Sequence, residues 1–254
     1  MRILAVNLRA GGSRATIDAL IARAVDRSPD AIVFSEFRNN AVGSRIRAAL
    51  QHAGYPYQAG PEDRTNGVLI ASRRDFSALR NPFGLPEDQY PNAVVRARFE
   101  NLTLYGVYLP GQDRKRPHLR CLIAAAQSAN EANAAAIAIG DFNSGRNETD
   151  IEANLGKQRL VDEFSTADLY AELERHWTEA WLYLHPGKTE FSWYPFRRQP
   201  PVQRRNGWRI DKAFVSRALL PRLAAAEYDH EFRLEGLTDH SALIVELRAL
   251  GLGT

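Results

Sequence analysis

Short apolar runs of strand length recur along the chain, and many of them end at a polar side chain. The run at residues 3–6 ends at Asn7, for example, and the run at residues 31–34 leads to Glu36. Such runs, bounded by turn-forming residues, are typical of strands buried in a sheet. We expect strands at residues 2–8, 31–34, 67–72, 93–99, 102–109, 137–139, 208–215, 224–229 and 242–247.

Fewer segments have helical periodicity. Apolar side chains from Ile17 to Val25 recur at helical spacing and Pro29 follows them, which predicts a helix at residues 17–25. Further helices are expected at residues 120–136 and 167–175. No repeat or linker interrupts these elements, and 44% hydrophobic residues is ordinary for a soluble globular protein. We therefore expect one α+β domain over residues 1–254.

The positive charge of the chain is almost entirely arginine. The net charge is +3 and the pI is about 9.1, with lysine only at four positions. Arginine presents a planar fork of donors that matches phosphate geometry, so this composition suits a phosphate-rich partner. A GC-rich genome produces the same bias, and the composition leaves both explanations open.

The cysteine content and the lack of a visible targeting or membrane segment predict a protein of the cytoplasm or nucleoid. Cys121 is the single cysteine and lies in an alanine-rich stretch, so we expect a buried, inert thiol and no intramolecular disulfide. Neither a signal peptide nor a membrane-spanning apolar stretch is visible.

Side chains able to carry chemistry lie at or next to the ends of the expected strands. Strand ends are rigid, so residues there can converge on one cleft. A single Asp after a strand is more often a turn former or a helix cap, but the recurrence of such positions favours a site. These residues are Asn7, Glu36, Tyr108, Asp141, Asn143, Asp211 and Asp239 with His240.

The segment Gly140-Asp141-Phe142-Asn143 is the sharpest of these. Gly140 allows a tight exit from a strand, and Asp141 and Asn143, two residues apart, would point the same way. A carboxylate can orient or deprotonate a water, and an amide can hold a phosphate oxygen. The alternative is a simple Asx-turn.

The pair Asp239-His240 precedes the last expected strand. An imidazolium there could face a phosphate that gains charge in the transition state, since the protonation of histidine is easily tuned. Asp211 could pair with His240 and hold its charge and orientation. The alternative is that Asp239 and His240 only cap the strand.

Glu36 is the best candidate for a metal ligand. Mg²⁺ keeps several waters and is typically held by one or two carboxylates together with substrate phosphates. Glu36 with help from Asn7 or Asp239 matches that pattern, with Mn²⁺ as an alternative ion. No Cys/His cluster has the spacing of a zinc site.

In order and type, these motifs resemble the endonuclease/exonuclease/phosphatase superfamily, and most of all the exonuclease III type of apurinic/apyrimidinic endonuclease. The resemblance extends from Asn7 to His240. Its most specific pieces are Phe191-Ser192-Trp193 and the stretch from Gly207 to Asp211. It implies a four-layer α/β/β/α sandwich, two mixed sheets packed face to face with helices outside and a metal cleft at one end.

The resemblance also implies roles for the residues of that cleft. Glu36 would hold Mg²⁺, with Asp239 serving the metal or its waters. Asp141 would orient the attacking water with Asn143 and Asn7, while His240, paired with Asp211, and Tyr108 would act at the phosphate. The pocket for a baseless sugar would be lined by Trp193, Trp208 and Ile210.

One departure from the family pattern concerns the metal site. The family often has an acidic or amide residue two positions after the first Asn, and this chain has Arg9 there. Arg9 also favours one alternative, a non-catalytic nucleic-acid-binding protein that keeps the fold.

Two basic segments are candidate substrate contacts. The first contains Arg197, Arg198, Arg204, Arg205 and Arg209, interleaved with aromatic residues and without an acidic residue between Phe191 and Arg209. Arginines neutralise phosphates and aromatic rings stack on bases, although a solvated loop is the alternative. The second contains Arg114, Lys115, Arg116 and His118.

Together these features predict a Mg²⁺-dependent nuclease that cleaves double-stranded DNA beside abasic sites and trims 3′ ends in DNA repair. The alternatives within the superfamily are a nuclease for RNA or single strands and a general phosphodiesterase. No membrane partner is expected, and a monomer is the default for such an enzyme.

Overall fold

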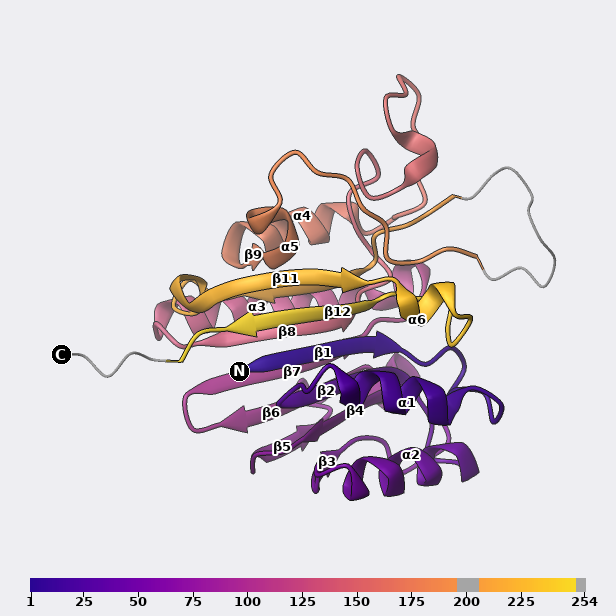
Figure 1. Cartoon of the computed structure of the whole chain (residues 1–254). Coiled ribbons are helices and arrows are strands. Elements are labelled where there is room, and N and C mark those ends of the chain that lie inside the picture. Colours follow the sequence, from indigo (N-terminus) through magenta and orange to yellow (C-terminus); the bar gives the residue numbers. More distant parts are fainter. Residues whose placement is uncertain (196–205, 250–254) are drawn as a thin grey trace.

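The apolar runs form the strands of two mixed six-stranded sheets in the computed structural model, which describes residues 1–195 and 206–249. The first sheet has the order β11-β12-β1-β2-β4-β3 and the second β5-β6-β7-β8-β10-β9 (Figure 1). The strands of the first sheet are β1 (Arg2–Asn7), β2 (Ala31–Phe37), β3 (Tyr57–Ala59), β4 (Gly67–Ser72), β11 (Leu223–Asp229) and β12 (Ala242–Leu247). Those of the second are β5 (Ser77–Arg80), β6 (Val94–Phe99), β7 (Leu102–Tyr108), β8 (Ala136–Asp141), β9 (Thr178–Glu179) and β10 (Asp211–Val215).

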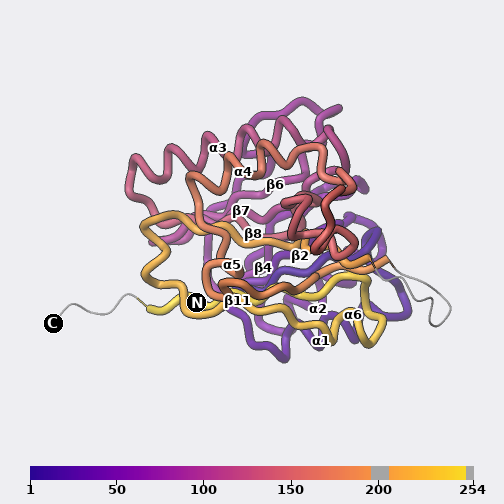
Figure 2. The backbone as a smooth tube through the Cα atoms, turned by 90° about the horizontal axis from the view of Figure 1, so that it is seen from above, coloured from indigo at the N-terminus to yellow at the C-terminus, as the bar shows by residue number. Residues whose placement is uncertain are grey.

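Helices cover the outer face of each sheet, as the view along the layers shows (Figure 2). The helices α1 (Ile17–Asp26) and α2 (Ala41–His52) pack on the first sheet, while α3 (Arg116–Glu131) and α4 (Ala167–His176) pack on the second. A third apolar cluster fills the space between the sheets and includes Ile3, Val33, Leu104 and Ile139. The expected four-layer sandwich is confirmed. Two short helices, α5 (Ala180–Leu184) and α6 (Glu231–Leu234), lie beside it.

Several element boundaries differ from the expected ones for local reasons. The helix expected at residues 120–136 runs from Arg116 to Glu131, because Pro117 is accepted in a first turn and Asn133, at φ +47°, follows its end. The strand expected from residue 208 begins at Asp211. Helix α2 was not expected, and its N-cap is Asn40, whose side chain accepts hydrogen bonds from the next turn.

Strand register brings the polar strand ends together. β7 and β8 are parallel and pair Tyr108 with Asp141, while β8 and β10 are antiparallel and pair Asp141 with Asp211. In the other sheet, β1 and β2 are parallel and pair Asn7 with Ser35. The hydroxyl of Ser35 donates to the carbonyl of Val107 across the two sheets, at 2.9 Å. These strand ends therefore meet at one end of the sandwich.

Backbone conformations that residues with a Cβ rarely adopt occur at this same end of the sandwich. Glu36 has φ +56° and lies where β2 shifts register against β4, between Phe34 and Phe37. Gly140 has φ +141°, and a Cβ there would lie 2.1 Å from the carbonyl oxygen of Val107. Unfavourable φ values persist where the surrounding structure holds them, and they gather at functional sites.

The environment of Cys121 differs from the buried one that the sequence predicts. Cys121 is half-buried rather than buried, and burial raises the pKa of its thiol. Within the described part of the chain, no helix combines the length and apolarity needed to cross a membrane.

Candidate active site

Asp141, at the end of β8, is the centre of a buried polar cluster. Its carboxylate accepts a hydrogen bond from the side-chain amide of Asn7 at 2.8 Å and from the backbone N–H of Asn143 at 2.8 Å. The side-chain amide of Asn143 also donates to it at 3.2 Å. Burial raises the pKa of Asp141 to about 7, against the opposing effect of His240. A carboxyl group with that pKa is suited to exchange a proton near neutral pH.

His240 is paired with Asp211 as the sequence predicted. The Nδ1 of His240 lies 2.9 Å from Oδ2 of Asp211, and both side chains are buried. Burial alone would lower the pKa of His240, but the charge and hydrogen bond of Asp211, with Asp141 and Asp239 nearby, raise it to about 10. The imidazole therefore carries a positive charge at neutral pH, and this charge interacts with the carboxylate of Asp141.

Glu36 receives two hydrogen bonds from the segment at the end of β1. Its carboxylate accepts from the side-chain amide of Asn7 at 3.2 Å and from the backbone N–H of Ala10. The side-chain oxygen of Asn7 accepts from the backbone N–H of Arg9 at 2.7 Å. Asn7 thus links Glu36 to Asp141 through its amide nitrogen, while its oxygen is directed to the following turn.

Asp239 is the other carboxylate expected near a metal. It accepts a hydrogen bond from the indole of Trp193 at 3.1 Å, and its Oδ1 lies 4.0 Å from Nε2 of His240. Nε of Arg9 lies 3.8 Å from its Oδ2.

These donors fit a hard divalent cation better than a zinc ion. Glu36 and Asp239 offer carboxylate oxygens, the ligand type that Mg²⁺ and Mn²⁺ prefer. Among residues 1–195 and 206–249, no three acidic, histidine or cysteine side chains cluster as a complete metal cage. A sparse pair of carboxylates leaves coordination positions for water and for a substrate phosphate.

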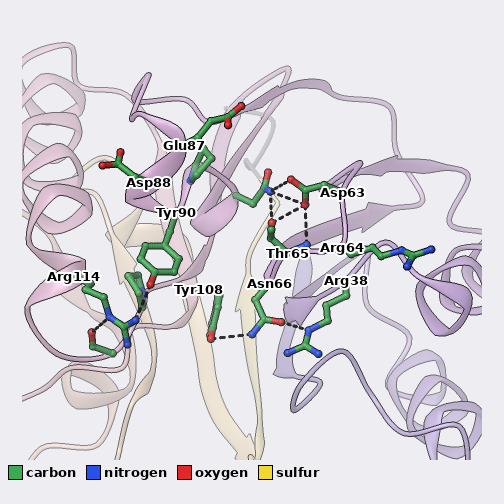
Figure 3. Close-up of a pocket in the computed structure, with 14 residues that line it drawn as sticks. Arg38, Asp63, Arg64, Thr65, Asn66, Glu87, Asp88, Tyr90, Tyr108 and Arg114 are labelled. Carbon is green, nitrogen blue, oxygen red and sulfur yellow. Dashed lines mark hydrogen bonds between the residues drawn. The ribbon is translucent and has the colours of Figure 1, made fainter.

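Tyr108, at the end of β7, lies beside a cavity of about 730 Å³ (Figure 3). Its hydroxyl accepts a hydrogen bond from the side-chain amide of Asn66 at 3.4 Å, and Asn66 in turn accepts from Arg38. Burial raises the pKa of Tyr108, so the phenol stays protonated and can donate to a phosphate oxygen.

Sequence reasoning missed several residues of this cavity. Arg38, Asn66 and Tyr90 line it together with Arg114, whose guanidinium donates to the Tyr90 hydroxyl at 2.7 Å. Asn66 immediately precedes β4, which is antiparallel to β2, so the start of β4 lies at the same edge as the end of β2. Antiparallel pairing was the signal that could have identified Asn66. The wall also carries the acidic residues Asp63, Glu87 and Asp88.

Trp193 and Trp208 stand together near Asp239. Their rings are 5.0 Å apart and tilted by 48°, and their backbones form a bridge. Ile210 is only 2% exposed and packs in an apolar cluster with Ile151 and Phe164, beneath the two tryptophans. Ile210 therefore supports the tryptophans, and its expected place on the pocket surface is corrected.

Three of the expected phosphate contacts are buried. Arg209 is 2% exposed, and its guanidinium pairs with Asp150 at 2.5 Å and with Glu179 at 2.6 Å. Lys115 is buried and donates to the carbonyl of Asn143, and His118 is buried with its Nε2 3.1 Å from the carbonyl of Tyr90. These three predictions were wrong, because each side chain finds its partner inside the protein.

The other basic residues divide into two groups. Arg114 is exposed at the cavity, and Arg116 pairs with Asp113 and Asp168 at the surface. Four further candidates lie outside the described residues, namely Arg197, Arg198, Arg204 and Arg205.

The sequence profile of the endonuclease/exonuclease/phosphatase family matches residues 4–240. The chain belongs to this family. The match spans every motif from Asn7 to His240, so the resemblance seen in the sequence is confirmed. It identifies the protein as a phosphodiester hydrolase, and dependence on a divalent metal is general in the family.

Solved structures share the fold over their whole length. An AP endonuclease from Archaeoglobus fulgidus is 20% identical with a TM-score of 0.76, and the match covers 98% of this chain and 100% of that one. A 3′ phosphatase from Neisseria bound to a product DNA hairpin is also 20% identical with a TM-score of 0.76, and the match again covers 98% of this chain and 100% of that one. A 3′-5′ exonuclease from Neisseria meningitidis is 21% identical with a TM-score of 0.77 and the same coverage. The comparison with curated proteins gives no match.

Proposed function

We propose that this protein is a Mg²⁺-dependent nuclease that cleaves double-stranded DNA at abasic sites and removes nucleotides or blocking groups from 3′ ends. The observation that carries the proposal is the buried cluster of opposite charges, Asp141 and His240, at the end of the sandwich where the strands stop. Asp141 accepts hydrogen bonds from Asn7 and Asn143, and its charge interacts with that of His240, which is paired with Asp211. The solved structures of similar fold include an AP endonuclease and a 3′ phosphatase bound to a DNA hairpin, which supports a DNA substrate.

In the proposed reaction, Asp141 holds a water and accepts its proton as the water attacks phosphorus. The bond from phosphorus to the leaving sugar oxygen breaks, and that oxygen takes up a proton from solvent. The amides of Asn7 and Asn143 fix the direction of that carboxylate, so little reorganisation is needed during the reaction. Asp141 is suited to this role because its pKa, about 7, allows the carboxylate to gain a proton at neutral pH.

His240 and Tyr108 stabilise the charge that develops on the phosphoryl oxygens. His240 remains protonated because Asp211 holds it, and Tyr108 offers a neutral hydroxyl. A divalent cation held by Glu36 and Asp239 would supply Lewis-acid polarisation of the same phosphate.

The tryptophans suit recognition of a damaged nucleotide. Trp193 and Trp208 present a tilted aromatic pair beside Asp239, large enough to pack against a sugar without a base. Arg114, at the cavity next to Tyr108, is placed to contact a neighbouring phosphate.

The first test is cleavage of an end-labelled duplex that carries one abasic-site analogue, with Mg²⁺ and with EDTA. We expect a single cut at the lesion that EDTA abolishes, while an undamaged duplex stays intact except at its 3′ ends. Mn²⁺ in place of Mg²⁺ identifies the preferred ion. Cleavage of RNA or single-stranded DNA alone would replace the proposed substrate, and cleavage of no nucleic acid would contradict the proposed function.

A further inference from the structure

The turn after β1 has an unusual backbone. Arg9, Ala10, Gly11 and Gly12 all have positive φ, at 55°, 54°, 85° and 86°. A run of left-handed residues is unfavourable for side chains with a Cβ, so contacts must hold Arg9 and Ala10 in place. The backbone N–H groups of these two residues donate to Asn7 and Glu36. The turn is therefore built on the same residues that are proposed to serve the metal.

This turn directs the side chain of Arg9 to Asp239. Nε of Arg9 lies 3.8 Å from Oδ2 of Asp239, with the arginine side chain 47% exposed and the aspartate 14%. The same carboxylate oxygen accepts the indole N–H of Trp193. Asp239 thus already has a cationic neighbour, contributed by the chain itself.

A guanidinium and a divalent cation at one carboxylate repel each other. Asp239 is largely buried, so the repulsion beside it is stronger than in bulk water. Glu36, the other carboxylate, already accepts two hydrogen bonds, so its oxygens have partners without a metal. The substrate-free site should therefore bind a cation more weakly than two carboxylates without partners would.

We propose that Arg9 competes with the divalent cation for Asp239, so that the protein without nucleic acid binds the cation weakly. This inference rests on the metal site of the proposed function and specifies how that site is regulated. A phosphodiester brings further negative charge, which accommodates both cations. Metal and substrate consequently bind more tightly together than the metal binds alone.

The test is calorimetric titration of the full-length protein with Mn²⁺ in the absence of nucleic acid. Arg9→Gln removes the charge and is expected to tighten Mn²⁺ binding about tenfold. Arg9→Lys keeps a charge and is expected to bind Mn²⁺ about as the wild type does. Arg45→Gln removes an exposed arginine that pairs with Asp18, and it controls for the change in net charge. Affinity of Arg9→Gln within twofold of the wild type would overturn the inference.

A double-mutant cycle tests whether Asp239 mediates the effect. In an Asp239→Asn background, Arg9→Gln is expected to leave Mn²⁺ affinity unchanged, and a persistent tenfold gain would overturn the proposed competition. The cleavage assay separates this inference from the function. If the wild type cleaves DNA but Arg9→Gln binds Mn²⁺ no more tightly than the wild type, the inference about Arg9 is wrong and the proposed function stands. If Arg9→Gln binds Mn²⁺ more tightly but the protein cleaves no nucleic acid, the inference about Arg9 stands and the proposed function is wrong.

Discussion

Asp141 occupies a position where burial and hydrogen bonding act against each other. Burial raises its pKa, while Asn7 and Asn143 direct three N–H groups at its carboxylate. The residue is thereby held in one orientation and still accepts a proton near neutral pH. An amide in its place would preserve the shape of the cluster and remove the base.

We predict that Asp141→Asn lowers kcat on an abasic duplex by about 1,000-fold and leaves the affinity for that duplex within a few-fold of the wild type. Single-turnover cleavage measures the first quantity, and fluorescence anisotropy in EDTA measures the second. Asp75→Asn, at an exposed aspartate, is the matched control. A rate close to that of the wild type would remove Asp141 from the mechanism.

His240 links the site to the stability of the protein. Its pKa in the folded protein is about 10 and the ordinary value is 6.5, so the folded state keeps a proton that the unfolded chain releases between these values. The pairing with Asp211 therefore stabilises fully below pH 6.5, and this stabilisation is lost as the pH rises through 10.

We predict that His240→Gln lowers the free energy of unfolding by on the order of 3 kcal/mol at pH 6. The difference from the wild type should shrink steadily towards pH 10. Urea unfolding of both proteins in EDTA, at intervals from pH 6 to pH 10.5, measures it. A difference that is independent of pH would show that the charge of His240 contributes nothing to stability.

Between elements, a buried ion-pair network fastens the segment before β10. Arg209 joins Asp150 to Glu179, and Lys212, on β10, also pairs with Asp150, at 2.8 Å. The backbone N–H of Arg209 donates to the carbonyl of Asp150 at 2.9 Å. Arg209 lies between Trp208 and Asp211 in the sequence, so the network fixes the backbone that carries both from inside the protein.

We predict that Arg209→Met lowers the free energy of unfolding by about 3–5 kcal/mol, because Asp150 and Glu179 would keep buried charges without their partner. Denaturant unfolding measures this, with Arg175→Met at an exposed position as control. The salt dependence of DNA binding should not change. A loss of salt dependence with normal stability would restore Arg209 to the substrate surface.

At the scale of the whole molecule, nucleic-acid binding depends on charge that the fold leaves at the surface. The buried positions of Arg209, Lys115 and His118 remove three of the expected contacts. Arg204 and Arg205, outside the described residues, remain predictions from sequence alone.

We predict that Arg204→Ala combined with Arg205→Ala weakens binding to duplex DNA and flattens the plot of log affinity against log salt by about 1–2 units of slope. Anisotropy titrations over a range of salt concentrations measure both effects. Arg45→Ala combined with Arg175→Ala makes the same change in net charge elsewhere. An unchanged slope would exclude the segment as a phosphate-binding surface.

The sequence by itself determined most of the strands and the residues of the candidate site, and its resemblance to the family implied the sandwich. Apolar runs of strand length specify buried strands, and the polar residues that end them, such as Asn7, Asp141 and Asp211, lie at the rigid edge where strands stop. The edge strands β3 and β5 were missed. β3 is three residues long and only half-buried, and β5 is exposed at every residue, so neither carries the apolar pattern of a buried strand.

Only the tertiary structure decided which charged residues face the solvent. Arg209 pairs with Asp150, 59 residues away, and with Glu179, 30 residues away, and nothing in the local sequence announces either partner. The approach of Arg9 to Asp239 likewise depends on β1 and β12 being neighbours in one sheet. The local sequence shows which side chains lie at the end of a strand. Their charged partners lie far away in the sequence, and only the fold brings the two together.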